Sequence, residues 1–244
     1  MHKLESQIFK SKLQTTSEEF KKNKESMIGM LEEIDILLDE AEAGGGPDHQ
    51  KRLAARGKLP VRERIFNFLD PDSPFLEISG LAGYKSDYPV GGGAVAGIGV
   101  CSGIECIIFA NDPTVLAGAM HYYSVKKWMR SMAIARDCRI PFIQFVESAG
   151  GDLRPRGAMS AGAMGHFAES GRQFYEITEL SKLNIPTVTV TFGTATAGGA
   201  YQPGMSDYNI FVKDQADVAL AGPPLVQMAT GEISSREDIG GAKM

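Results

Sequence analysis

Phe142-Ile-Gln-Phe-Val146 runs directly into Glu147-Ser-Ala-Gly-Gly151, and this pair of segments decides the fold class of the 244-residue chain. A short run of apolar and β-branched residues that ends in small residues predicts a buried strand with a tight glycine turn at its exit. The pattern recurs where Thr187-Val-Thr-Val-Thr-Phe192 leads through Gly-Thr-Ala into Thr196-Ala-Gly-Gly-Ala-Tyr201. Two strands therefore end in glycine loops.

Further strand-like runs and two amphipathic helical patterns surround these loops. The helical patterns cover residues 124–136 and 162–183. The remaining strand-like runs are residues 94–100, 104–111, 209–212 and 218–220. Strands that alternate with helices predict an α/β fold, in which loops at one edge of the sheet perform the chemistry.

The first part of the chain has a different character. Between Thr16 and Ala43, apolar residues recur at the spacing of one helix face. They are Met27, Leu31, Ile34 and Leu38. Gly44-Gly-Gly-Pro47 then predicts a helix stop and a flexible joint. We expect a helical arm over residues 1–57, either solvated or docked to a partner, and the main domain over residues 58–244.

Composition excludes several classes of function. With 43% hydrophobic residues the chain can bury a large core, and its net charge of -5 gives no reason to expect nucleic acid as a partner. No apolar run approaches the roughly 20 residues that a membrane span needs. The N-terminus mixes lysine and glutamate, unlike a secretory or transit peptide, so we expect a cytoplasmic protein without a membrane partner.

Cysteine and histidine give no metal-binding pattern. The three cysteines have no CxxC spacing and sit in or beside apolar segments, so buried, reduced thiols are expected. The four histidines are scattered along the chain. We therefore predict no metal site.

The two glycine loops suit the stabilisation of an oxyanion. A thioester enolate carries negative charge on oxygen, which a pair of preorganised backbone N–H groups can stabilise. Glycines allow the close approach, so Gly150, Gly151, Gly198 and Gly199 are the candidate donors. The small or aromatic neighbours expected to contact the substrate are Ala149, Ala197, Ala200 and Tyr201. Ser148 lies outside any GxSxG elbow, so a serine nucleophile is not predicted.

A basic helical stretch supplies candidate phosphate contacts. Lys126 and Lys127 head this stretch, which could meet the phosphates of a nucleotide-containing cofactor. A solvated basic face explains the same pattern equally well.

The chain resembles the carboxyltransferase family, the β subunits of biotin-dependent acyl-CoA carboxylases, most closely its methylcrotonyl-CoA and geranyl-CoA branch. The resemblance covers all but the N-terminal helix. The matching segments include Arg56-Gly-Lys-Leu-Pro-Val-Arg-Glu-Arg-Ile65, Leu69-Asp-Pro-Asp-Ser-Pro-Phe75, Ala110-Asn-Asp-Pro-Thr-Val115, Thr196-Ala-Gly-Gly-Ala-Tyr201 and Leu220-Ala-Gly-Pro-Pro-Leu-Val226. Many relatives have Asp-Ser-Gly-Gly-Ala where this chain has Glu147-Ser-Ala-Gly-Gly151.

The resemblance implies a crotonase-like fold that transfers a carboxyl group from carboxybiotin to an acyl-CoA. It implies biotin on a separate carrier protein, coenzyme A thioesters as substrates, and a biotin carboxylase subunit as partner. Relatives have a second, homologous half that completes the site, usually in a dimer. The resemblance thus implies that a C-terminal carboxyltransferase half is missing here and that the chain works in a homo- or hetero-oligomer.

Two other functions stay open at this level. A biotin-dependent acyl-CoA decarboxylase needs the same amides, because it runs the enolate chemistry in reverse. A non-catalytic assembly subunit of a carboxylase complex would use the helical arm and the domain surface. The intact glycine loops argue against the second alternative.

Overall fold

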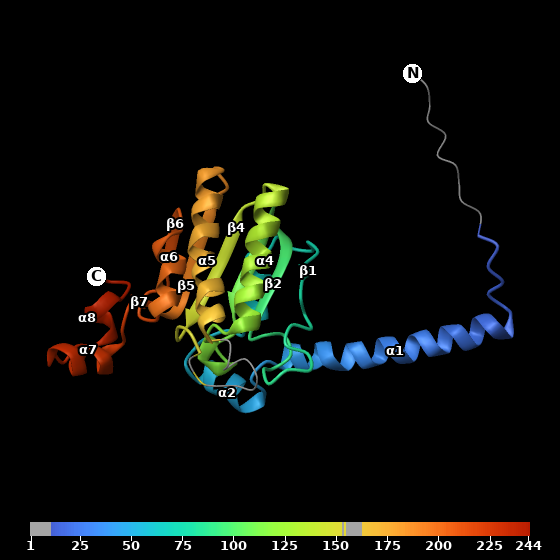
Figure 1. Cartoon of the computed structure of the whole chain (residues 1–244), viewed down its shortest axis with the longest axis horizontal. Coiled ribbons are helices and arrows are strands. Elements are labelled where there is room, and N and C mark those ends of the chain that lie inside the picture. The colour runs from blue at the N-terminus through green and yellow to red at the C-terminus, as the bar shows by residue number, and fades with distance from the viewer. Residues whose placement is uncertain (1–10, 153, 155–162) are drawn as a thin grey trace, which may run out of the picture. The chain divides into compact units, whose positions relative to one another are not determined.

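The computed structural model describes residues 11–152, 154 and 163–244 (Figure 1). The chain divides into two units, with the boundary between Leu37 and Leu38. Helix α1 (Glu18–Ala43) spans that boundary. The second unit therefore begins upstream of residue 58, where the main domain is predicted to start, and it includes helix α2 (Pro47–Ala55), whose Leu53 is buried.

Helix α1 matches the predicted helix. Its N-cap is Ser17, whose Oγ accepts a hydrogen bond from Phe20 N at 3.2 Å. The predicted apolar row is present but exposed, with Met27 at 54% and Leu31 at 50%.

The glycine joint after α1 is packed, so the predicted flexibility was wrong. Gly44 has φ +58°, a conformation that favours glycine. A Cβ on Gly45 would lie 1.9 Å from the carbonyl oxygen of Thr114, and Gly45 N donates to Thr114 Oγ1 at 3.0 Å. These contacts fix the joint on the turn that follows strand β3.

The core of the second unit is a seven-stranded mixed sheet. Its strands are β1 (Leu76–Glu77), β2 (Ala94–Cys101), β3 (Ile104–Asn111), β4 (Phe142–Ser148), β5 (Thr187–Thr196), β6 (Tyr208–Phe211) and β7 (Asp217–Ala219). They run in the order β1-β2-β3-β4-β5-β6, and β7 pairs with the far end of β5. Strands β1 to β3 are antiparallel, whereas β3 to β6 are parallel. The carboxyl ends of β3, β4 and β5 therefore lie at one edge.

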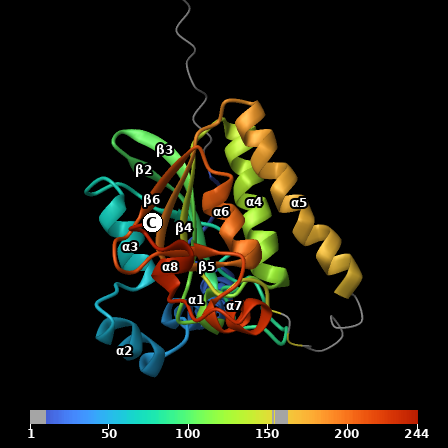
Figure 2. The same ribbon diagram turned by 90° about the vertical axis from the view of Figure 1, so that its left-hand side faces the viewer.

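Helices cover both faces of the sheet (Figure 2). They are α3 (Val61–Phe68) on one face and α4 (Tyr122–Cys138), α5 (Ala163–Lys182) and α6 (Tyr201–Gly204) on the other, with α7 (Pro223–Thr230) and α8 (Arg236–Gly240) near the C-terminus. Alternate residues of β4 face opposite cores: Phe142 packs in the cluster of α4 and α5, and Phe145 packs in the cluster of α3. The predicted strands and helices are confirmed within a few residues, although the first predicted residue of α5, Gly162, lies outside the described residues.

The cysteines differ in their surroundings. Cys106 is buried, and burial raises the pKa of its thiol to about 11. Cys138 is exposed at the end of α4, so the prediction of buried thiols was wrong for this residue. The charged residues Arg136 and Asp137 precede it in the last turn, and their side chains reach solvent.

Candidate oxyanion site

The two glycine loops lie against each other at the carboxyl edge of the parallel strands. The first glycine loop (Ser148–Gly151) follows β4, and the second (Thr196–Tyr201) follows β5. A Cβ on Gly150 would lie 3.0 Å from the carbonyl oxygen of Thr196, and a Cβ on Gly199 would lie 3.3 Å from Ser148 Oγ. The fold thus brings together the two segments that were predicted to form one site.

Most amides of the first glycine loop are already bonded within the protein. Ala149 N donates to the carbonyl of Ala117 at 3.1 Å, and Gly150 N donates to Ser148 Oγ at 3.2 Å. Gly150 is buried with φ +97°, while a Cβ on Gly151 would meet nothing within 4 Å. Among the described residues, no hydrogen-bond acceptor is found for Gly151 N. The open amide of this loop is therefore that of Gly151.

The second glycine loop begins as the short 3₁₀ helix η3 (Ala197–Ala200) and continues into α6. The first two amides of such a turn have no partner within the helix. Gly198 is partly exposed, and a Cβ there would meet nothing within 4 Å. Gly199 and Ala200 are buried. The candidate donor of this loop is therefore Gly198 N, because of the first two amides of the turn it is the one in a residue without a side chain.

Each loop thus contains one glycine that packs and one that is open. Gly150 and Gly199 hold the loops against each other, whereas Gly151 and Gly198 border open space. Ala149 and Ala197 are exposed beside them. Within the part of the chain that the structure describes, no side chain lies within 4 Å of a Cβ built on Gly151 or Gly198, which suits a carbonyl oxygen that gains negative charge.

The remaining predicted contacts are placed differently. Tyr201 is 44% exposed, and its ring centroid lies 4.7 Å from that of Phe174 on α5. Ala200 is only 8% exposed and lies behind the open amides. Lys126 is exposed on α4, with its ammonium 4.7 Å from the ring centroid of Tyr122. Lys126 keeps the access to solvent that a phosphate contact requires.

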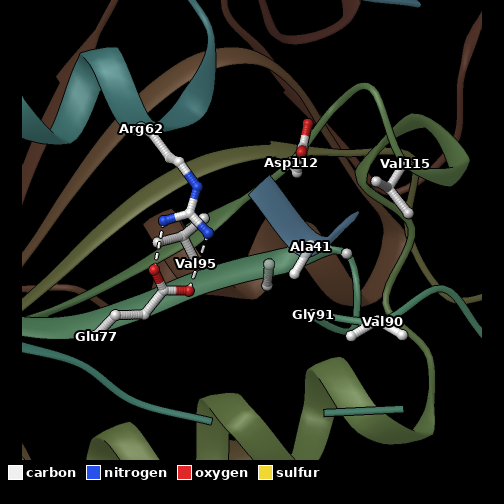
Figure 3. A pocket seen from close by; sticks show the side chains of 10 residues that line it. Ala41, Arg62, Glu77, Val90, Gly91, Val95, Asp112 and Val115 are labelled. Atoms are coloured by element: carbon white, nitrogen blue, oxygen red, sulfur yellow. Dashed lines mark hydrogen bonds and ion pairs between the residues drawn. The ribbon is translucent and has the colours of Figure 1, made fainter. Parts of the chain in front are cut away.

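Lys127 does not belong to a basic surface. It is 2% exposed, and its Nζ donates to the carbonyls of Ala94 at 2.7 Å and Gly91 at 3.1 Å. Its ammonium is thus occupied inside the protein, so the predicted contact with substrate is corrected to a structural role. Gly91 and Ala94 also line a small hollow beside the paired side chains of Arg62 and Glu77 (Figure 3).

The burial of Lys127 predicts a pH-dependent stability. Desolvation lowers the pKa of Lys127 from 10.5 to about 8. Between these pH values the unfolded chain binds the extra proton, so the free energy of unfolding rises with pH. Relative to Lys127→Met, the wild type should gain about 3 kcal/mol between pH 7.5 and 10.5. Urea unfolding at both pH values measures this difference, and an unchanged difference would contradict the assignment.

Other residues of the site escaped the sequence analysis. Ala117 and Ser148 accept the amide hydrogens of Ala149 and Gly150, which leaves only Gly151 open in the first loop. The left-handed turn at Leu116, with φ +51°, and Ala117, with φ +55°, brings the Ala117 carbonyl to that position. No local pattern indicates this turn, because leucine and alanine do not favour the left-handed conformation.

The described residues contain neither a metal-binding cluster nor a membrane-spanning helix. Within residues 11–152, 154 and 163–244, no group of three or more His, Cys, Asp or Glu side chains is arranged to hold a metal ion. No helix in the same ranges is both long enough and apolar enough to cross a membrane.

A mixed sheet with two adjoining glycine loops at the carboxyl edge of its parallel strands defines an α/β protein. The chain belongs to the carboxyl transferase domain family, whose model matches residues 52–244. The crotonase-like fold expected from the resemblance is thereby confirmed, together with the relationship to acyl-CoA carboxylase β subunits.

Individual relatives agree with this assignment. The chain is 48% identical over 219 residues to a probable biotin-dependent acyl-coenzyme A carboxylase beta2 subunit of Mycobacterium tuberculosis, covering 90% of this chain and 40% of the relative. It is 41% identical to a probable methylcrotonoyl-CoA carboxylase beta chain of Drosophila melanogaster, covering 100% of this chain and 42% of the relative. The chain thus spans about two fifths of the length of these relatives.

Solved structures give the same result. The geranyl-CoA carboxylase beta subunit of P. aeruginosa superposes with a TM-score of 0.81 at 39% identity, over 96% of this chain and 43% of that one. The transcarboxylase 12S subunit, solved with methylmalonyl-coenzyme A and methylmalonic acid bound, superposes with a TM-score of 0.79 at 25% identity, over 89% of this chain and 42% of that one.

Proposed function

We propose that this chain forms the acyl-CoA side of a carboxyltransferase in a biotin-dependent acyl-CoA carboxylase. The observation that carries the proposal is the pair of open amides, Gly151 N and Gly198 N, on two loops that pack against each other. In this assignment the thioester oxygen of the substrate accepts a hydrogen bond from each amide. Gly150 and Gly199 act as spacers that keep the two donors together.

The proposed chemistry follows from the charge on that oxygen. When the carbon beside the thioester loses a proton, the charge spreads to the carbonyl oxygen, where preorganised N–H donors stabilise it. The donors are fixed before the reaction, so they need no reorganisation as the charge develops. The carbon of the resulting enolate then takes up the carboxyl group, and the biotin nitrogen from which that group is cleaved would take up the proton. Lys126, exposed one turn into α4, is the candidate contact for a phosphate of coenzyme A.

Carboxybiotin, when it is bound, supplies the carboxyl group. The rim of the site fits a flat ring carried in from outside, because Ala149, Gly151 and Ala197 are exposed and have no side chain beyond Cβ. The proposal includes biotin on a carrier protein and a biotin carboxylase as partners, since the relatives are named biotin-dependent carboxylase subunits. It also includes a second carboxyltransferase half in an oligomer, because the chain spans about two fifths of those relatives.

Binding of a matched pair of ligands tests the proposal. We would titrate the chain with a short branched acyl-CoA and with its thioether analogue, in which CH₂ replaces the carbonyl. Two hydrogen bonds worth about 1 kcal/mol each should favour the thioester by roughly 10- to 50-fold. Isothermal titration calorimetry gives both dissociation constants. Equal affinities would refute the role of the two amides, whereas failure of both ligands to bind would refute the assignment to acyl-CoA.

A further inference from the structure

We propose that Lys58, Arg64 and Glu147 form a positioning cluster that sets the two glycine loops relative to each other. The inference deepens the proposed function and rests on it. It assigns a role to the segment Arg56–Ile65, which carries the family resemblance but contributes no residue to the oxyanion site.

The pairing of β4 with β5 breaks next to the loops. Val146 pairs with Thr191, but the next pair is Ser148 with Ala195. One residue of β4, Glu147, therefore faces three residues of β5. Such a bulge leaves backbone groups outside the regular ladder, and those groups need other partners.

Lys58 is a hydrogen-bond partner for a group on each of the two strands. Its Nζ lies 2.5 Å from Glu147 Oε1 and donates to the carbonyl of Phe192 at 2.9 Å. The side chains of Lys58 and Glu147 are only 12% and 11% exposed, so solvent screens this ion pair weakly. One ammonium thus connects the end of β4 to the middle of β5.

Arg64 holds the other side of the same carboxylate. Its Nη1 lies 2.9 Å from Glu147 Oε2, which makes an ion pair. The geometry of this contact is not that of a hydrogen bond. Its guanidinium carbon lies 4.6 Å from the ring centroid of Phe192, and its Nε donates to the carbonyl of Leu59 at 2.8 Å. Helix α3, through Arg64, and the segment before it, through Lys58, therefore both contact strands β4 and β5.

Backbone segments lie close to Glu147 on two sides. A Cβ on Gly193 would lie 2.7 Å from the carboxylate of Glu147, and a Cβ on Gly118 would lie 2.0 Å from its carbonyl oxygen. The residue after Glu147 is Ser148, which accepts the amide hydrogen of Gly150 and lies against Gly199. A displacement of Glu147 would therefore move Ser148, which contacts a glycine of each loop.

The test measures how strongly each variant still prefers the thioester over the thioether. For Glu147→Gln and Lys58→Met we expect this preference to fall by about tenfold, a change of 1.4 kcal/mol. Affinity for coenzyme A without an acyl group should stay unchanged. Glu147→Asp keeps the charge and should restore part of the preference. Lys58→Met retains the ion pair of Arg64 with Glu147. It therefore tests the inference even if Glu147→Gln fails to fold.

Glu77→Gln is the matched control. Glu77 pairs with Arg62 on the same helix α3, has a side chain that is 24% exposed, and belongs to strand β1 at the other end of the sheet from β5. Its substitution should leave the preference within about twofold of the wild type, since an independent site contributes separately. The inference is overturned if Glu147→Gln and Lys58→Met keep the preference, or if they weaken thioester and thioether equally. If the wild type itself shows no preference, the proposed function fails and the inference fails with it.

Discussion

Replacing Gly198 by valine should abolish the preference for a thioester without unfolding the protein. A Cβ on Gly198 meets nothing within 4 Å, so the fold has room for the side chain, which then occupies the space in front of the open amides. In a carboxylase assembled with the remaining subunits, loss of an oxyanion donor should lower kcat by about 10²- to 10³-fold. The midpoint of urea unfolding and the rate of carboxylation measure the two effects.

The neighbouring glycine provides the comparison. Gly199 is buried, and a Cβ there would lie 3.3 Å from Ser148 Oγ, so Gly199→Val should lower the free energy of unfolding by about 1–3 kcal/mol. A variant at Gly198 that binds the thioester as tightly as the wild type, with its normal preference, would contradict the assignment of that amide.

Replacing Gly118 by alanine should produce the largest loss of stability. Its Cβ would lie 2.0 Å from the backbone oxygen of Glu147, which cannot rotate away, and its φ of +68° disfavours any side chain. Overpacking and backbone strain together should cost about 2–5 kcal/mol in the free energy of unfolding. Urea denaturation followed by circular dichroism measures the loss.

Gly103 separates the two causes of that loss. It has φ +75° in the two-residue turn between β2 and β3, but a Cβ there would meet nothing within 4 Å. Gly103→Ala should therefore cost only the strain of the backbone, about 1–2 kcal/mol. Equal losses at the two positions would show that the close approach of Gly118 to Glu147 is not important.

The strands and the location of the loops could be predicted because their signals are local. Residues 104–111 form a strand in the structure with the predicted bounds, since their apolar run is bounded by a tight turn and by Asn111. The strand after Thr187 continues to Thr196, beyond the predicted end at residue 192, because Thr194 to Thr196 pair with β7. That pairing is a contact between distant segments, which a local pattern does not contain.

The identity of the open amides could not be predicted for the same reason. Gly150 and Gly151 look alike in the sequence, and only the hydrogen bond from Gly150 N to Ser148 Oγ distinguishes them. The prediction that Lys127 contacts the substrate was wrong because Lys127 shares one face of α4 with Ser124 and Ser131, and that face is polar but buried. The carbonyl of Gly91, before β2, and that of Ala94, at its start, accept hydrogen bonds from Lys127 Nζ. The spacing of residues in α4 does not indicate these two partners.

The role of the two open amides is tested most directly by a crystal structure of the chain with a bound acyl-CoA analogue. The analogue retains the carbonyl but cannot be hydrolysed. The account predicts that the carbonyl oxygen lies about 2.7–3.1 Å from both Gly151 N and Gly198 N. It also predicts that Gly150 N remains bonded to Ser148 Oγ. A carbonyl bound away from both loops, or held by side chains instead of these two amides, would contradict the account.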